Sequence, residues 1–90
     1  MRYLIVIGKE PDSQNYSAFS PDVLGCIAVG DTFEECKMSM REALEFHLEG
    51  MLKDGDPIPV PHTSSDDPDI PHGPNYIPVY MDIPIPNVAA

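Results

Sequence analysis

Nine of the eleven prolines in this 90-residue chain fall after residue 56, and this uneven distribution constrains the fold more than any other feature. Proline fixes its own φ angle and lacks an N–H donor, so a proline-rich stretch cannot continue a helix or form a central strand. Residues 57–75 contain six prolines together with serines and aspartates, which predicts an extended surface loop. Regular structure must therefore come from residues 1–56 and from one short segment after the loop.

Three short strands are predicted before residue 31. Residues 2–9 (RYLIVIGK) are almost continuously aromatic or β-branched, and residues 14–19 and 25–30 follow clusters of turn-forming residues. Strands joined by tight turns predict an antiparallel meander. Residues 76–83 (YIPVYMDI) predict a last strand, and Pro78 favours an edge position for it.

A helix is predicted between Thr32 and Gly55. Thr32 followed by Glu35 fits the capping box, and Gly55 is a residue type that commonly ends helices. Between them, apolar residues recur at helical spacing and form one stripe. The stripe consists of Phe33, Cys36, Met40, Ala43, Leu44, His47, Leu48 and Met51.

These elements predict an α+β domain with the order β-β-β-α-β. We expect one domain over residues 1–90, with β-β-β-α in 1–56, a Pro/Asp-rich loop in 57–75, the last strand in 76–83 and a tail in 84–90. One helix would cover one face of a sheet made of the three-stranded meander plus a fourth strand. We expect the fourth strand to run parallel to the first, through a right-handed crossover.

The first strand is apolar on both sides, with Tyr3, Ile5 and Ile7 on one face and Leu4 and Val6 on the other. The sequence does not fix which of these faces the helix covers. A single helix leaves the second face bare, which predicts that this face is buried against another chain. We therefore expect a homodimer or larger oligomer, with an interface drawn from Tyr3, Ile5, Ile7 and Tyr80.

The charge balance indicates the kind of partner. Five basic residues stand against fifteen acidic ones, for a formal net charge of −10. Nucleic-acid phosphates must be neutralised by Lys and Arg, so direct nucleic-acid binding is not expected. A basic protein is the natural complement, although acidity can also serve solubility alone. No signal peptide or membrane segment is predicted, and Cys26 and Cys36 are expected to be free buried thiols of a cytoplasmic protein.

A series of short motifs, none specific alone, resembles the HicB antitoxin family by its order and spacing. The motifs are Tyr16-Ser17-Ala18, Pro21-Asp22 before Gly25-Cys26, Gly30-Asp31-Thr32 with Glu34-Glu35, Arg41-Glu42-Ala43, His47-Leu48-Glu49, and Gly55 before Pro57-Ile58-Pro59. The resemblance implies a degenerate, partial RNase H-like fold that binds and masks a small basic HicA-type toxin, which cleaves mRNA. Many members also carry a C-terminal DNA-binding domain. Only seven residues follow Ile83 here, so we expect none.

Catalytic and metal sites are not predicted, and neither is a cofactor. An RNase H-type site needs converging carboxylates around two metal ions, with one in the middle of the first strand, and RYLIVIGK has none. His47, His62 and His72 lack the spacing of a metal site. The candidate contacts for a basic partner are Asp31, Glu34, Glu35, Asp66, Asp67 and Asp69, although the first three also suit helix capping. The alternative to an antitoxin is an orphan homo-oligomeric domain with a structural or regulatory role.

Overall fold

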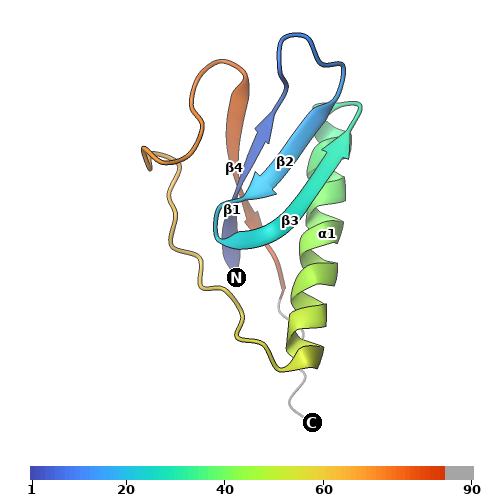
Figure 1. Cartoon of the computed structure of the whole chain (residues 1–90), viewed down its shortest axis with the longest axis vertical. Coiled ribbons are helices and arrows are strands. Elements are labelled where there is room, and N and C mark those ends of the chain that lie inside the picture. Colours follow the sequence, from blue (N-terminus) through green and yellow to red (C-terminus); the bar gives the residue numbers. More distant parts are fainter. Residues whose placement is uncertain (85–90) are drawn as a thin grey trace.

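A computed structural model describes residues 1–84 of the chain. Four strands and one helix follow the expected β-β-β-α-β order, which confirms the α+β class (Figure 1). Their bounds are β1 Arg2–Gly8, β2 Tyr16–Ser20, β3 Val23–Gly30, α1 Phe33–Asp54 and β4 Tyr76–Asp82. Only Pro84 of the expected tail lies within the described residues.

All four strands belong to one antiparallel sheet in the order β3-β2-β1-β4. β4 lies at an edge, as Pro78 predicted, but its expected parallel orientation is wrong. Its register with β1 is antiparallel, with Gly8 opposite Tyr76 and Arg2 opposite Asp82. The reason lies in residues 57–75, which we call the strap. α1 ends at one end of the sheet, and the strap runs back to the other end before β4 begins (Figure 1).

The helix forms as its sequence dictates. The Thr32 side chain accepts a hydrogen bond from the Glu35 amide at 3.1 Å, and Gly55 ends the helix in the left-handed conformation with φ 77°. Cys36, Met40, Leu44 and Leu48 are buried along one side. They pack on the face of the sheet that carries Tyr3, Ile5 and Ile7.

The opposite face of the sheet is covered by the strap. Leu4 and Val6 are buried in a second, smaller cluster with Ile70 of the strap, and Phe19 and Tyr76 pack against it. Leu4 and Val6 therefore do not need another chain to bury them, because the strap covers the β1 part of this face. Tyr3, Ile5 and Ile7 lie inside the core under α1 and offer no surface to a second copy. Of the four residues expected at an oligomer interface, Tyr80 alone is exposed.

Candidate functional site

The side chain of Asp22 holds the strap in place. Asp22 follows β2 in the turn before β3, and its carboxylate is almost fully buried. It accepts hydrogen bonds from the His62 amide at 2.9 Å, the Thr63 amide at 3.0 Å and the Thr63 hydroxyl at 2.6 Å. The His62 ring nitrogen Nε2 also lies 3.0 Å from the carboxylate. Burial alone would raise the pKa of Asp22, but the hydrogen bonds from Thr63 and His62 outweigh it and lower the pKa.

Three further hydrogen bonds tie the strap to the sheet. The Tyr3 hydroxyl donates to the carbonyl of Pro59 at 2.6 Å, and the Ser65 amide donates to the Tyr80 hydroxyl at 2.9 Å. Near the end of the strap, the Lys9 amide donates to the carbonyl of Asn75 at 3.0 Å. The strap is irregular but anchored along its length, so the side chains on its outer surface are held in fixed positions.

Asp66, Asp67 and Asp69 lie together at the outer bend of the strap. Ser64 donates a hydrogen bond to the carboxylate of Asp66, which lowers the pKa of Asp66. Asp67 accepts from the Asp69 amide at 2.9 Å, and its carbonyl lies 2.8 Å from His72 Nε2. Asp66 and Asp69 are exposed, and Asp67 is half-buried. The bend thus presents carboxylates on a locally ordered turn.

Asp31, Glu34 and Glu35 lie at the start of α1, and all three are exposed. Glu34 and Glu35 occupy the first turn, where the positive end of the helix dipole favours acidic residues. The helix begins beside the β3 edge of the sheet, whereas the strap bends beside the β4 edge (Figure 1). The structure therefore separates the two groups of predicted partner contacts and does not join them in one acidic patch.

The sequence argument missed an apolar surface on β3. Leu24, Ile27 and Val29 are large, exposed and on the face that points away from α1, whereas Val23 and Cys26 point into the core. The alternation of Cys26 and Ala28 with Ile27 and Val29 was a usable signal for a two-sided strand. The position of Leu24 was harder to predict, because it depends on an irregularity in the pairing with β2 between Phe19 and Ser20.

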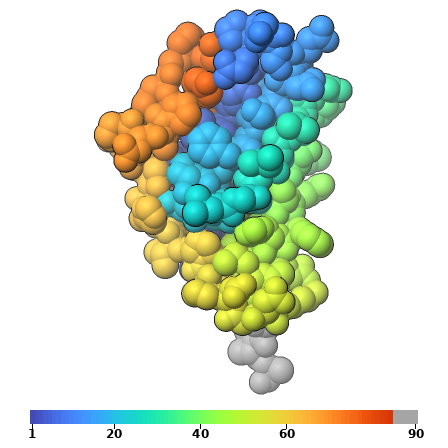
Figure 2. All heavy atoms as spheres, in the orientation of Figure 1, coloured from blue at the N-terminus to red at the C-terminus, as the bar shows by residue number. Residues whose placement is uncertain are grey.

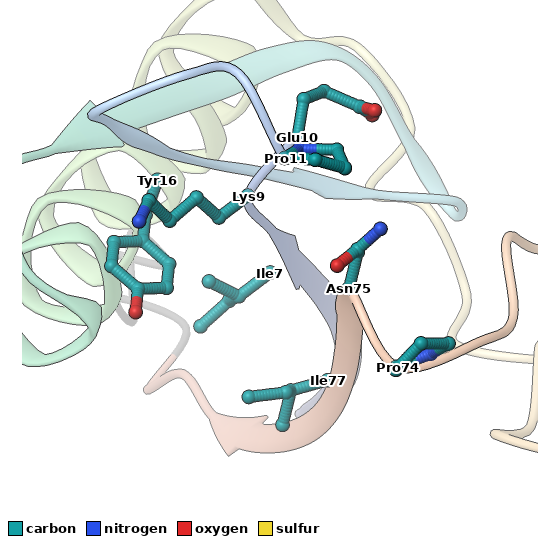
Figure 3. A pocket seen from close by; sticks show the side chains of 8 residues that line it. All are labelled: Ile7, Lys9, Glu10, Pro11, Tyr16, Pro74, Asn75 and Ile77. Atoms are coloured by element: carbon teal, nitrogen blue, oxygen red, sulfur yellow. The ribbon is translucent and has the colours of Figure 1, made fainter.

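A shallow hollow of about 220 Å³ lies at the other end of the sheet, where β1 ends and β4 begins (Figure 3). Ile7, Tyr16 and Ile77 line it, with Lys9 and Glu10 beside them. Both charged groups already have partners. The Lys9 ammonium lies 5.8 Å from the centre of the Tyr16 ring, and Glu10 accepts a hydrogen bond from the Tyr76 hydroxyl at 2.7 Å. That hydrogen bond raises the pKa of Tyr76.

The histidines are dispersed over the molecule. His47 is half-buried on α1, His62 contacts Asp22, and His72 contacts the strap bend. Within residues 1–84, no three metal-ligating side chains come close enough together to hold a metal ion. Cys26 and Cys36 are free and buried, as expected, and burial raises the pKa of both thiols. No helix in the described part of the chain has the length and apolar character needed to cross a membrane.

Comparison with known proteins gives one consistent family. Residues 3–87 match the HicB-like antitoxin of bacterial toxin-antitoxin systems. A 14.9 kDa protein from the rep-hol intergenic region of Haemophilus phage HP1 is 44% identical over 59 residues. That alignment covers 66% of this chain and 43% of the phage protein, so the chain spans less than half the length of this relative.

Two solved structures share the fold. The N-terminal domain of Burkholderia pseudomallei antitoxin HicB superimposes with a TM-score of 0.74 at 20% identity, over 93% of this chain and 99% of that one. A chain from the HicA3 and HicB3 toxin-antitoxin complex superimposes with a TM-score of 0.70 at 28% identity, with the same coverage.

Proposed function

Because the chain belongs to the HicB-like antitoxin family, we propose that it binds and masks a small basic HicA-type toxin that cleaves mRNA. The observation that carries the proposal is the family match over residues 3–87. The likeness to a chain of the HicA3 and HicB3 complex, at 28% identity, supports a partner of this kind. Such an activity is binding and not catalysis.

The distribution of charge supports a basic partner. No Lys or Arg occurs in residues 10–36 or 54–90, so the strap and β4 carry acidic residues without basic ones, and β2 and β3 carry no charged residue. A toxin that cleaves RNA needs a basic surface to hold the phosphates. An acidic protein placed on that surface competes with RNA for the same charges, and the attraction also speeds the encounter.

Of the two acidic groups, we assign the larger role to the strap acids Asp66, Asp67 and Asp69. The strap is anchored to the sheet by Asp22, Tyr3 and Tyr80, so its bend does not have to be ordered when a partner binds. Asp31, Glu34 and Glu35 contribute to partner binding as well, but the stability that acidic residues give to a helix start is already a sufficient reason for their presence there.

Three finer statements belong to the same proposal. The protein acts in the cytoplasm, where an mRNA-cleaving partner would work, and it does not bind nucleic acid directly because of its charge of −10. Its sheet and helix represent a degenerate RNase H-like fold. Homo-oligomer formation also remains a prediction, although Leu4 and Val6 no longer support it because the strap covers them.

The test uses the product of the reading frame beside the gene for this chain, which we expect to be a small basic protein. Purified toxin alone should cleave RNA, and equimolar chain should abolish the cleavage. Changing Asp66, Asp67 and Asp69 together to Asn should weaken binding on the order of tenfold or more. The matched control changes the exposed helix acids Glu42, Glu45 and Glu49 to Gln, which removes the same charge elsewhere and should have little effect. Unprotected RNA at equimolar wild-type chain would refute the proposal.

A further inference from the structure

β3 exposes a row of large apolar side chains on an unprotected edge of the sheet. The exposed fractions are 85% for Leu24, 73% for Ile27 and 63% for Val29. Gly25 has a φ of 81°, and the pairing with β2 shifts between Phe19 and Ser20. This irregularity sends both Val23 and Cys26 into the core and leaves Leu24 outside with Ile27 and Val29. β-bulges of this kind commonly redirect side chains at functional surfaces.

The row continues an apolar surface that the strap covers in part. Phe19 is the register partner of Ile27 and also packs against the buried cluster of Leu4, Val6 and Ile70. The strap thus covers β1 on this face and leaves the β3 part open. Figure 2 shows the end of the strap in orange beside β2 and β3 in cyan on one side of the molecule. Sheets normally protect an apolar edge strand by covering it or charging it, and within residues 1–84 the outer face of β3 has neither protection.

Charge decides between the possible occupants of this surface. Residues 10–36, which include β2 and β3, contain acidic residues but no Lys or Arg, and the same holds for residues 54–82. A second copy carries the same net charge of −10, and it has no Lys or Arg on β2, β3 or the strap to offset the repulsion. A basic protein gains both the apolar contact and the charge attraction.

We propose that the outer surface of β3, formed by Leu24, Ile27 and Val29, is a docking surface for a basic protein partner. Its apolar residues make the central contact, and the exposed acids Asp31 and Glu34, which follow β3 at the start of α1, lie at the rim. An apolar centre with a charged rim is the usual anatomy of a protein interface. This inference rests on the proposed function and specifies where the partner binds.

The first test is site-specific photo-cross-linking in the cells that encode the protein. A photo-reactive amino acid replaces Ile27 in one variant and Phe46 in a control, because Phe46 is 81% exposed on α1. We expect position 27, but not position 46, to form one adduct with a protein that has more Lys and Arg than Asp and Glu. Peptide sequencing then identifies that protein. An adduct with a second copy of this chain, equal labelling at both positions, or no adduct at position 27 would overturn the proposal.

The second test reconstitutes the complex from the purified chain and the identified protein. Ile27→Glu should weaken binding on the order of a hundredfold if Ile27 sits at the centre of the contact, and Phe46→Glu should change it less than about threefold. Both side chains are exposed, so both variants should keep the wild-type melting temperature. Equal affinities for the two variants would place the partner elsewhere while leaving the proposed antitoxin function intact. A partner that binds at Ile27 but cleaves no RNA would refute the antitoxin function and leave the docking surface standing.

Discussion

The two faces of the sheet are buried in different ways. On one face, four buried side chains of a 22-residue helix pack over Tyr3, Ile5 and Ile7. On the other, the strap buries Leu4 and Val6 mainly with one side chain, Ile70. The helix satisfies its own backbone hydrogen bonds, whereas the strap depends on the side chains of Asp22, Tyr3 and Tyr80 to hold it in place.

This difference indicates that α1 and the strap detach from the sheet at different free-energy costs. Losing the helix removes most of the core, so it amounts to unfolding the protein. Releasing the strap breaks a few hydrogen bonds and exposes a small cluster, which is the description of a local opening. The strap face is therefore the part of the molecule where a partner, a substitution or a change of pH can act without unfolding the rest.

The largest expected effect is on the helix face. Leu44 is fully buried in the main core, so Leu44→Ala should lower the free energy of unfolding by about 3 kcal/mol or more. Chemical denaturation followed by circular dichroism measures this loss. We expect one transition for the whole protein, with all probes shifted together. A loss below about 1 kcal/mol would mean that α1 is not the main cover of the sheet.

A smaller and more local effect is expected on the strap face. Ile70 is 6% exposed, and Ile70→Ala should cost about 2 kcal/mol, at the low end for an Ile-to-Ala change because an irregular strap can collapse into the space. Hydrogen exchange should show faster exchange at the strap amides of Thr63 and Ser65, with the helix amides little changed. Equal acceleration in both regions would show that the strap and the helix open as one unit.

The sequence predicted the helix face well and the strap face poorly, for a physical reason. The capping signal at Thr32, the apolar stripe and Gly55 are local patterns, so they could be recognised without knowledge of the fold. The strap is held by contacts between distant residues, such as Asp22 with Thr63 and Leu4 with Ile70. Asp22 looked like an ordinary turn residue, and no spacing linked it to residues 62–63.

The orientation of β4 was wrong for the same reason. A short connection from α1 would have delivered the last strand parallel to β1, as in a usual crossover. The proline-rich composition identified a loop but did not say that it spans the length of the sheet. Of the predicted site residues, Asp66, Asp69 and Tyr80 are exposed and Asp67 is half-buried, whereas Tyr3, Ile5 and Ile7 lie in the core. The exposed row on β3 depended on a bulge that composition does not reveal.

The anchor of the strap can be weakened without a large change in volume. In Asp22→Asn, the amide loses the charge that strengthens the bonds from His62 and Thr63, so we expect a loss of about 1.5 kcal/mol. Exchange at the strap amides should rise as it does for Ile70→Ala. Asp12→Asn serves as the control, because Asp12 is exposed in the loop before β2 and should have no measurable effect. Similar stability for the two variants would exclude Asp22 as the anchor.

The smallest expected effects are those of pH on stability. Acid pH should destabilise the strap face of the sheet, and alkaline pH should destabilise the helix face. The folded-state pKa of Asp22 lies below its ordinary value of 3.8. The ionised Asp22 therefore adds to the free energy of unfolding above pH 3.8, and this stabilisation is lost as the pH falls through the lower folded-state pKa. The thiols of Cys26 and Cys36 have folded-state pKa values above the ordinary 9.0 because they are buried. The protonated thiols therefore add to the free energy of unfolding below pH 9.0, and this stabilisation is lost as the pH rises through their folded-state pKa values.

Acid should therefore loosen the strap face and alkali the helix face. Hydrogen exchange would be corrected for the intrinsic rate at each pH. Strap protection in the wild-type protein should then fall below pH 3.8 toward that of Asp22→Asn, whose strap protection should vary less over this range. Above pH 9, helix protection should fall first, and Cys36→Ala should reduce that dependence because it removes one titrating thiol. Strap and helix signals that fall together at both extremes would mean that the two faces are not independent, and that neither covering can open without unfolding the other.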